Sequence, residues 1–209
     1  IKIDNKGNKW IGTYRSGVFK IEGDTSIHYI EEAGLLDNSI LHITIDSNNT
    51  KWISTNAGIS SFNDRGWNSF TIDDGLPSIN INTSIIDSKN DILFATMHGL
   101  AIYDYNNWTK VTISNSNLPN SYIYALEKDL ANNIWIGSNG GLSKLGTPLI
   151  NYFESDGLPS NTVTSLATDT SGAIWVGTNN GLSYFNMTSF TNYSHNNGII
   201  GDYITSIAV

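Results

Sequence analysis

Cysteine is absent from this 209-residue chain, so it has no disulfide and no cysteine-based metal or redox site. Charged residues are scarce at 14%, and the formal net charge is -8 at pH 7. The 11 Lys and Arg residues form no cluster, which argues against a nucleic-acid-binding surface. No apolar run approaches the roughly 18 residues of a membrane-spanning helix, so we expect no membrane insertion. No signal peptide is present, and because the chain starts at Ile1 rather than Met we expect it to be a piece of a longer protein.

The chain does have strong internal repetition. A tetrapeptide of Trp or Leu, an apolar residue, a small residue and Thr or Ser recurs five times, at spacings of 42, 41, 42 and 40 residues. The copies are Trp10–Thr13, Trp52–Thr55, Leu93–Thr96, Trp135–Ser138 and Trp175–Thr178. An Asp precedes each copy, at Asp4, Asp46, Asp87, Asp129 and Asp169. The predicted units are 1–34, 35–75, 76–117, 118–157 and 158–198, with the start of a further unit at 199–209.

Each unit contains four short runs rich in Ile, Val, Thr and aromatic residues, separated by turn residues, and these runs predict four strands. In the second unit the strands, which we call a to d, are expected at 40–46, 51–55, 58–62 and 67–72. The Trp and the small residue of strand b share one face, which predicts close packing against a neighbouring sheet. The Asp after strand a predicts a turn in which its carboxylate accepts backbone N–H groups.

Four strands in a period of about 41 residues predict an all-β fold, a β-propeller of four-stranded antiparallel blades, with no helix longer than about one turn. A sheet of about 40 residues cannot bury both faces alone, so the blades must pack on one another. Residues 1–209 form either a closed five-bladed ring or five blades of a larger propeller. In the ring, Ile204–Val209 would pair beside Trp10–Thr13 and complete the first blade.

The fourth and fifth units carry the phrases Asp-x-x-Gly-x-Ile-Trp-Val-Gly-Thr-x-x-Gly-Leu, over Asp169–Leu182, and Asp-Gly-Leu-Pro-Ser-Asn-x-Val, over Asp156–Val163. These phrases resemble the two-component-regulator propeller repeat, and the resemblance covers the five units with the third one degenerate. It implies a seven-bladed propeller in the periplasmic sensor region of a hybrid histidine kinase linked to glycan uptake. A periplasmic or extracellular location, a glycan fragment or other small polar ligand, and a protein partner or homodimer formed through neighbouring domains follow from the same resemblance. The chain contains no kinase, receiver or DNA-binding segment, so we expect signalling output to lie outside it.

The sequence offers little that predicts catalysis. The four histidines, His28, His42, His98 and His195, stand at different positions of their units, and none has metal-ligand spacing. No nucleophile elbow, phosphate-binding loop or cysteine nucleophile is present. We therefore predict no catalytic residue, no metal ligand and no cofactor. The Trp residues of strand b are expected in the core, and Trp67 and Trp108, which lie outside the strand-b register, are the more exposed candidates for a sugar-stacking surface.

Binding residues are expected where the units differ. In a four-stranded antiparallel blade the b–c and d–a loops share one end of the strands, and loops on a rigid scaffold concentrate binding groups. These loops, with the start of strand a, contain the predicted ligand-binding residues Tyr14, Arg15, Asn38, His42, His98, Tyr122, Asn139, Asn161 and Asn179.

The favoured function is a non-catalytic, extracytoplasmic ligand-binding region of a sensor. Two alternatives stay open. One is a streptogramin-lyase-like propeller enzyme, which should show a His and a Glu clustered near the axis. The other is a structural or interaction propeller of a secretion or surface protein.

Overall fold

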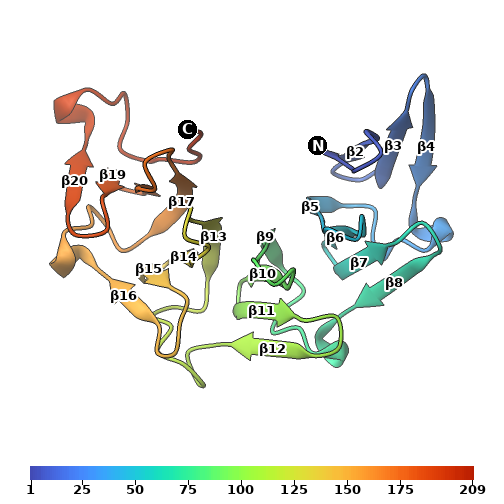
Figure 1. The fold of residues 1–209 in the computed structure, drawn as a ribbon, viewed down its shortest axis with the longest axis horizontal. Helices are drawn as coiled ribbons and strands as arrows, with labels where there is room; N and C mark the ends of the chain where they lie inside the picture. Colours follow the sequence, from blue (N-terminus) through green and yellow to red (C-terminus); the bar gives the residue numbers. More distant parts are fainter. The chain divides into compact units, whose positions relative to one another are not determined.

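The computed structural model describes residues 1–209 and contains β-strands and four 3-10 segments of three residues each. Five antiparallel four-stranded sheets follow one another along the chain (Figure 1). The predicted all-β fold of four-stranded blades is therefore confirmed. None of the short helical segments is long and apolar enough to span a membrane.

In every sheet the four strands lie side by side in chain order, as strands a, b, c and d. The first sheet contains β1 (Lys2–Ile3), β2 (Lys9–Gly12), β3 (Val18–Glu22) and β4 (Thr25–Tyr29). The second contains β5 (Ile40–Ile45), β6 (Lys51–Thr55), β7 (Gly58–Phe62) and β8 (Trp67–Phe70), and the third β9 (Ile81–Ile86), β10 (Ile92–Thr96), β11 (Gly99–Tyr103) and β12 (Trp108–Val111). The fourth contains β13 (Ile123–Lys128), β14 (Ile134–Ser138), β15 (Gly141–Lys144) and β16 (Ile150–Tyr152), and the fifth β17 (Val163–Thr168), β18 (Ile174–Thr178), β19 (Gly181–Phe185) and β20 (Phe190–Tyr193). The 3-10 segments are η1 (Glu31–Ala33), η2 (Ile72–Asp74), η3 (Glu154–Asp156) and η4 (His195–Asn197), each after a strand d.

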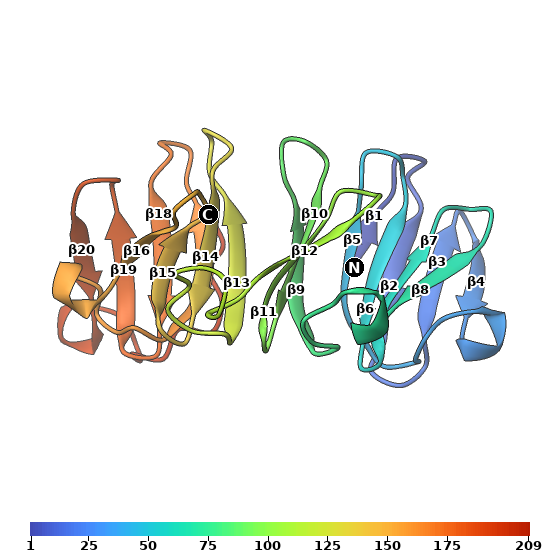
Figure 2. The ribbon, with the colours of Figure 1, turned by 90° about the horizontal axis from the view of Figure 1, so that it is seen from below.

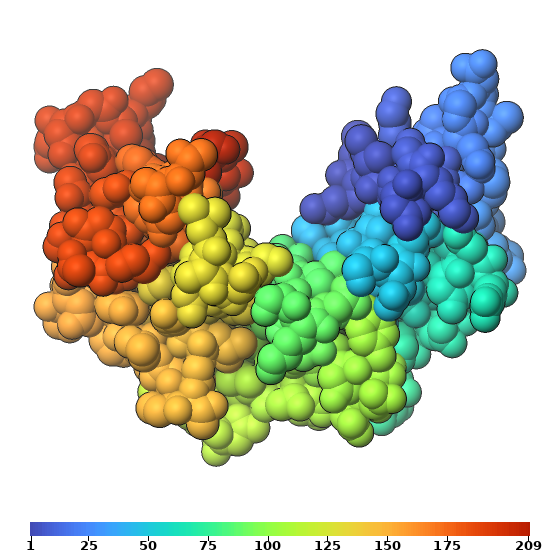
Figure 3. All heavy atoms as spheres, in the orientation of Figure 1, coloured from blue at the N-terminus to red at the C-terminus, as the bar shows by residue number.

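The chain divides into two compact units, residues 1–97 with 101–110 and residues 98–100 with 111–209. Within the first unit β1 and β2 lie beside β5, and β5 lies beside β9. The space-filling view shows the dark blue first sheet against the light blue second one (Figure 3). Within the second unit β13 lies beside β17. Neighbouring sheets thus meet through their first strands.

Each end of the chain makes its backbone contacts within its own compact unit. The first sheet takes its first strand from Lys2–Ile3. Residues 203–209 form no strand, and the Ile204 N–H donates to the Thr178 carbonyl at 2.9 Å. The choice between a closed ring and a larger propeller stays a prediction.

The small residue of strand b is where neighbouring sheets come into contact. A Cβ placed on Gly137 would lie 2.7 Å from Cγ1 of Val163, which begins β17 of the next repeat. Gly12 meets Ile40 in the same way, and Gly177 meets Ile204. The predicted close packing is confirmed at these three glycines, because a Cβ there would displace Ile40, Val163 or Ile204 of the next repeat.

The repeated Asp holds both its own turn and the Trp of strand b. One oxygen of Asp4 accepts the N–H groups of Lys6 and Asn8, at 3.0 and 2.9 Å, as the turn prediction requires. The other oxygen accepts the indole N–H of Trp10 at 3.0 Å, and both side chains are buried. The same bond joins Asp46 to Trp52 and Asp129 to Trp135. The turn is thereby fixed to the core of its blade.

Trp67 and Trp108 are more exposed than the buried Trp10, Trp52 and Trp135, as predicted, but both rings also pack on neighbouring aromatic residues, and a role in stacking on a ligand stays a prediction. Trp67 is half-buried and lies 4.8 Å from Phe62 between ring centroids, and Trp108 lies 4.5 Å from Tyr103. The turn before each blade covers the ring, since a Cβ on Gly34, whose φ is 108°, would lie 2.8 Å from Trp67 Cδ1. These two rings close the edge of the core.

The buried indole bond predicts a specific loss of stability. Trp135→Phe keeps an aromatic ring but leaves the buried carboxylate of Asp129 without one donor, which should cost about 1–3 kcal/mol of unfolding free energy. Trp108→Phe, a similar truncation at a half-buried ring, is the matched control and should cost less. Urea unfolding measures both; equal losses in the two variants would show that the bond adds nothing to the fold.

Candidate functional site

The b–c loops and the starts of strands a lie at the same end of each blade, as predicted. In four repeats the first backbone N–H of the b–c loop donates to a carbonyl at the start of strand a. The pairs are Asn56 to Ser39, Met97 to Asn80, Asn139 to Tyr122, and Asn179 to Thr162. In Figure 2 the a–b turn between β9 and β10 lies at the opposite, upper end of its strands. The residues predicted to bind ligand therefore share one end of the strands within each compact unit.

Tyr14 and Arg15 are both exposed at this end of the first unit. The Tyr14 side chain is exposed, and the Arg15 guanidinium carbon lies 5.0 Å from the centroid of its ring. This cation–π contact orders two long side chains without burying them. An aromatic ring and a permanent positive charge are thus presented together to solvent.

Asn38 and Asn161 are used by the d–a loop itself. The amide oxygen of Asn161 accepts the Glu154 N–H at 2.9 Å, and the Asn161 N–H donates to the Glu154 carboxylate at 2.9 Å. Asn38 and Glu31 make the same reciprocal pair, at 3.1 and 3.2 Å. These asparagines clamp the 3-10 turn before strand a. Their predicted contact with a ligand stays a prediction.

The second unit brings Tyr122 and Asn139 together. The Tyr122 ring lies 4.6 Å from that of Tyr124, and the Tyr122 carbonyl accepts the Asn139 N–H at 3.0 Å. The Asn139 amide oxygen accepts the Thr162 hydroxyl at 3.0 Å, so this side chain bridges two repeats. Asn179 and His98 are exposed in their b–c loops.

His42 lines a cavity of about 280 Å³ in the first unit, together with Ile1, Lys2, Gly12 and residues 40–43. One ring nitrogen bonds the Ser84 backbone, whereas Nε2 is buried and has no hydrogen-bond partner. Burial, followed by the positive charge of Lys2, lowers the pKa of His42 to about 4. The ring is therefore neutral at pH 7, and Nε2 is an unused acceptor.

Ser54 lies directly across from His42 in the β5–β6 ladder, and its hydroxyl is also buried without a partner. The two side chains do not hydrogen-bond to each other. This is not the arrangement of an activated nucleophile, in which the base is within hydrogen-bond reach. The structure also contains no group of three or more His, Cys, Asp or Glu side chains that could hold a metal ion.

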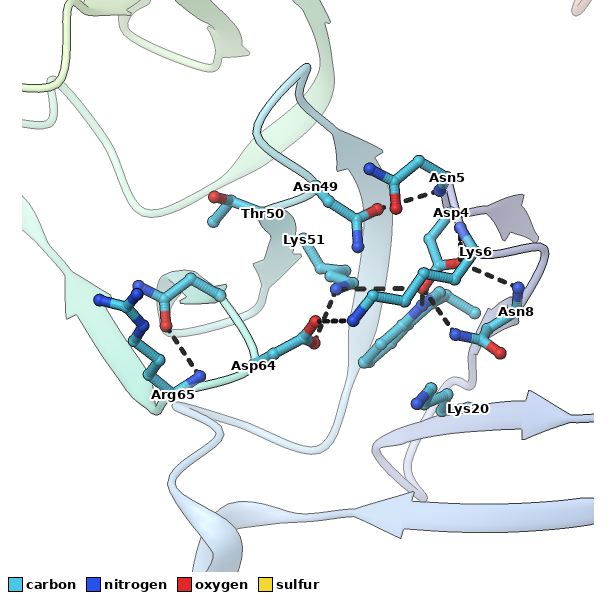
Figure 4. A network of polar contacts seen from close by, with 12 residues as sticks. Asp4, Asn5, Lys6, Asn8, Lys20, Asn49, Thr50, Lys51, Asp64 and Arg65 are labelled. Carbon is cyan, nitrogen blue, oxygen red and sulfur yellow. Dashed lines mark hydrogen bonds and ion pairs between the residues drawn. The ribbon is translucent and has the colours of Figure 1, made fainter.

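The sequence did not predict a fully buried lysine, Lys51. Lys51 has a fully buried side chain, and its Nζ lies 2.9 Å from Asp64 and 4.0 Å from Asp4 (Figure 4). The ammonium also lies 5.0 Å from the centroid of the Trp10 ring. Bonds from Lys6 and then Lys51 lower the pKa of Asp64 in spite of its partial burial. The available signal was that Lys51 stands where the later repeats have Ile92, Ile134 and Ile174.

Residues 157–180 match the family model described as two component regulator propeller. The search of curated proteins finds no match to the chain.

Solved structures give broader similarity. The chain is 30% identical to the extracellular domain of BT3049 of B. thetaiotaomicron, described as a hybrid two component system. The alignment covers 89% of this chain and 27% of that one, with a TM-score of 0.76. The chain therefore spans about a quarter of the length of this relative. The family match and this neighbour confirm the resemblance inferred from the repeats.

Two further neighbours show the fold alone. Virginiamycin B lyase from Staphylococcus aureus is 17% identical, with a TM-score of 0.73 over 92% of this chain and 68% of that one. PorZ, a surface component of the type-IX secretion system of Porphyromonas gingivalis, is 16% identical, with a TM-score of 0.71 over 96% and 34%.

The polar cluster around Asp4 predicts acid sensitivity. Burial alone would raise the pKa of Asp4, but hydrogen bonds from Trp10 and Asn8 lower it from 3.8 to about 2. A carboxyl group with a depressed folded-state pKa stabilises the fold above its unfolded value and loses that contribution as the pH falls from about 4 to 2. Asp4→Asn should make the pH dependence of unfolding free energy shallower by on the order of 1–2 kcal/mol over this range.

Urea unfolding at a series of pH values measures this slope. Asp24→Asn, at an exposed position, is the control. An unchanged slope in the Asp4 variant would contradict the assignment.

Proposed function

We propose that this chain, which is built of two-component-regulator propeller repeats, is a non-catalytic, extracytoplasmic ligand-binding region of a two-component regulator. The observation that carries the proposal is the 30% identity with the extracellular domain of BT3049 over 89% of the chain. Because the chain spans only 27% of that relative, the activity of the whole protein is itself part of the proposal.

The ligand binds at the end of the strands formed by the b–c and d–a loops. Two features support this end: the exposed pair of Tyr14 and Arg15, and the unused Nε2 acceptor of His42 in its cavity. A glycan fragment suits both, since a sugar hydroxyl can donate to a neutral imidazole, and a sugar face or an acidic substituent can contact the aromatic ring and the guanidinium.

A lyase-type enzyme is the less favoured alternative. The similarity of this chain to a lyase is a similarity to a structure with 17% identity, which supports a shared fold but not a shared reaction. The histidines have local roles that need no substrate: His28 stacks on Phe19 at 4.2 Å, and His195 pairs with Asp202 at 2.6 Å. The alternative of a scaffold in a surface assembly rests likewise on a likeness in fold.

The location of the ligand predicts which substitutions impair sensing. Arg15→Ala, His98→Ala and Asn139→Ala, made singly in the intact regulator, should each weaken the response to its inducing glycan by about threefold to tenfold, the loss of one polar contact. Lys6→Ala and Lys89→Ala, in a–b turns at the other end, are controls that should leave it unchanged. A reporter-gene titration measures the response. Full retention in the three variants, with losses in the controls, would end the proposal.

His42 predicts an unusual pH profile for binding. Because its pKa is lowered to about 4, Nε2 stays an acceptor well below pH 6, so affinity should be constant between pH 7.5 and 5.5. His42→Thr, which copies Thr83 of the next repeat, should reduce affinity about tenfold with little change in melting temperature. Calorimetric titration measures the affinity of the wild-type chain across this pH range and the affinity of the variant, and thermal unfolding measures the melting temperature. A loss of affinity centred near pH 6.5 would show that the ring is an ordinary exposed histidine.

A further inference from the structure

The far end of the blades, where the a–b and c–d turns lie, contains a second set of contacts between neighbouring repeats. Between the first and second repeats, the amide oxygen of Asn49 accepts the Asn5 N–H at 3.0 Å. Asp64, in a c–d turn with φ of 66°, binds Lys51, whose ammonium faces the carboxylate of Asp4. An asparagine and a c–d turn residue of one repeat thus fill the space beside the Asp–Trp pair of the preceding repeat.

The junction of the second and third repeats is filled by different residues at the same two positions. Asn90 accepts the Ser47 N–H at 3.2 Å, as Asn49 accepts that of Asn5. Tyr105, with φ of 70°, replaces Asp64, and its hydroxyl donates to Asp46 at 2.7 Å. Asn90 also donates to the Tyr105 oxygen at 2.6 Å. At this junction the phenol of Tyr105, rather than an ammonium group, is the partner of the repeated carboxylate.

At the junction of the fourth and fifth repeats both filling residues are missing. Gly172 stands in the place of Asn49 and Asn90, and Met187, with φ of 72°, stands in that of Asp64 and Tyr105. A cavity of about 400 Å³ is found at this junction, lined by Asp129, Leu130, Trp135, Lys144, Tyr152 and Met187 among others. We call it the junction pocket. It lies wholly within the second compact unit.

The lining of the junction pocket specifies its occupant. One oxygen of Asp129 accepts the Trp135 indole at 2.9 Å and the Asn133 amide at 2.8 Å, as Asp4 accepts Trp10 and Asn8, but the carboxylate receives no hydroxyl or ammonium from the fifth repeat, unlike Asp46 and Asp4. Leu130 corresponds to Asn5 and Ser47, and Gly172 has no side chain to accept its N–H. Lys144, whose ammonium lies 5.8 Å from the Trp135 ring centroid, disfavours a second cation. The side chains of Leu130 and Met187 are 67% and 39% exposed and suit a ring.

We propose that the junction pocket binds a tyrosine side chain of a partner polypeptide. The phenol takes the place that Tyr105 fills two repeats earlier: its hydroxyl donates to Asp129, and its ring lies against Trp135, Leu130 and Met187. A carbonyl of the partner accepts the Leu130 N–H in place of the missing asparagine. This site is at the opposite end of the strands from the proposed ligand, so it stands or falls independently of the proposed function.

The probe for the test is N-acetyl-L-tyrosinamide, titrated into the ¹⁵N-labelled 209-residue chain and followed by NMR. We expect saturable shifts of the Trp135 indole N–H and the Leu130 amide, with the indoles of Trp10 and Trp52 unmoved as internal controls. N-acetyl-L-phenylalaninamide, which lacks the hydroxyl, should bind at least about fivefold more weakly. Equal affinity of the two amides, or no saturable shift at Trp135, would overturn the proposal.

Filling the pocket provides the second test. Gly172→Asn with Met187→Tyr rebuilds the junction of the second and third repeats, so it should raise the melting temperature and abolish the tyrosinamide shifts. Met187→Tyr alone is the fallback should the double variant fail to fold, and it should weaken binding at least about tenfold. Retained binding in a folded variant overturns the proposal. So does stronger binding of N-acetyl-L-lysinamide or methyl glucoside, which would assign the pocket to a cationic side chain or a sugar.

Discussion

The hydrogen bond between the repeated Asp and the strand-b Trp is the constraint on which the core of the first, second and fourth blades depends. A buried indole N–H and a buried carboxylate each cost free energy unless they are paired, and here they pair with each other. The same carboxylate closes the a–b turn, so one residue fixes the turn, the ladder of strands a and b, and the ring in the core. The third repeat has Leu93 in place of Trp, and Asp87 there keeps its backbone bonds to Lys89 and Asp91.

Once the first two strands are fixed, the two ends of a blade are free to differ in chemistry. At one end the b–c and d–a loops present Tyr14, Arg15 and the cavity of His42. At the other end the turns meet the next repeat, and the residue at the c–d position decides whether the junction is filled by an ion pair, a phenol or nothing. Variation among copies is therefore where the scaffold acquires function.

The sequence predicts what depends on a single repeat. The period, the four strands, the Asp turn and the small residue opposite the next sheet all follow from local patterns, and the structure contains each of them. It does not predict contacts made by a neighbouring repeat. The contact of Trp67 with the turn at Gly34 was not predicted, because that turn lies in the repeat before. The burial of Lys51 was not predicted, because its partners, Asp4 and Asp64, lie in other turns. For the predicted site, sequence located the loops but not the internal use of Asn38 and Asn161.

The central claim is that repeated residues build the scaffold and non-repeated loop residues do the sensing. A saturation mutagenesis scan of the intact regulator, scored in parallel for cellular abundance and for signalling output, tests it most directly. Substitutions at Asp4, Asp46, Asp129 and their Trp partners should lower abundance and signalling together. Substitutions at Tyr14, Arg15 and His98 should lower signalling at normal abundance. Signalling defects at normal abundance that concentrate on the repeated Asp and Trp residues, with none in the loops, would contradict the account.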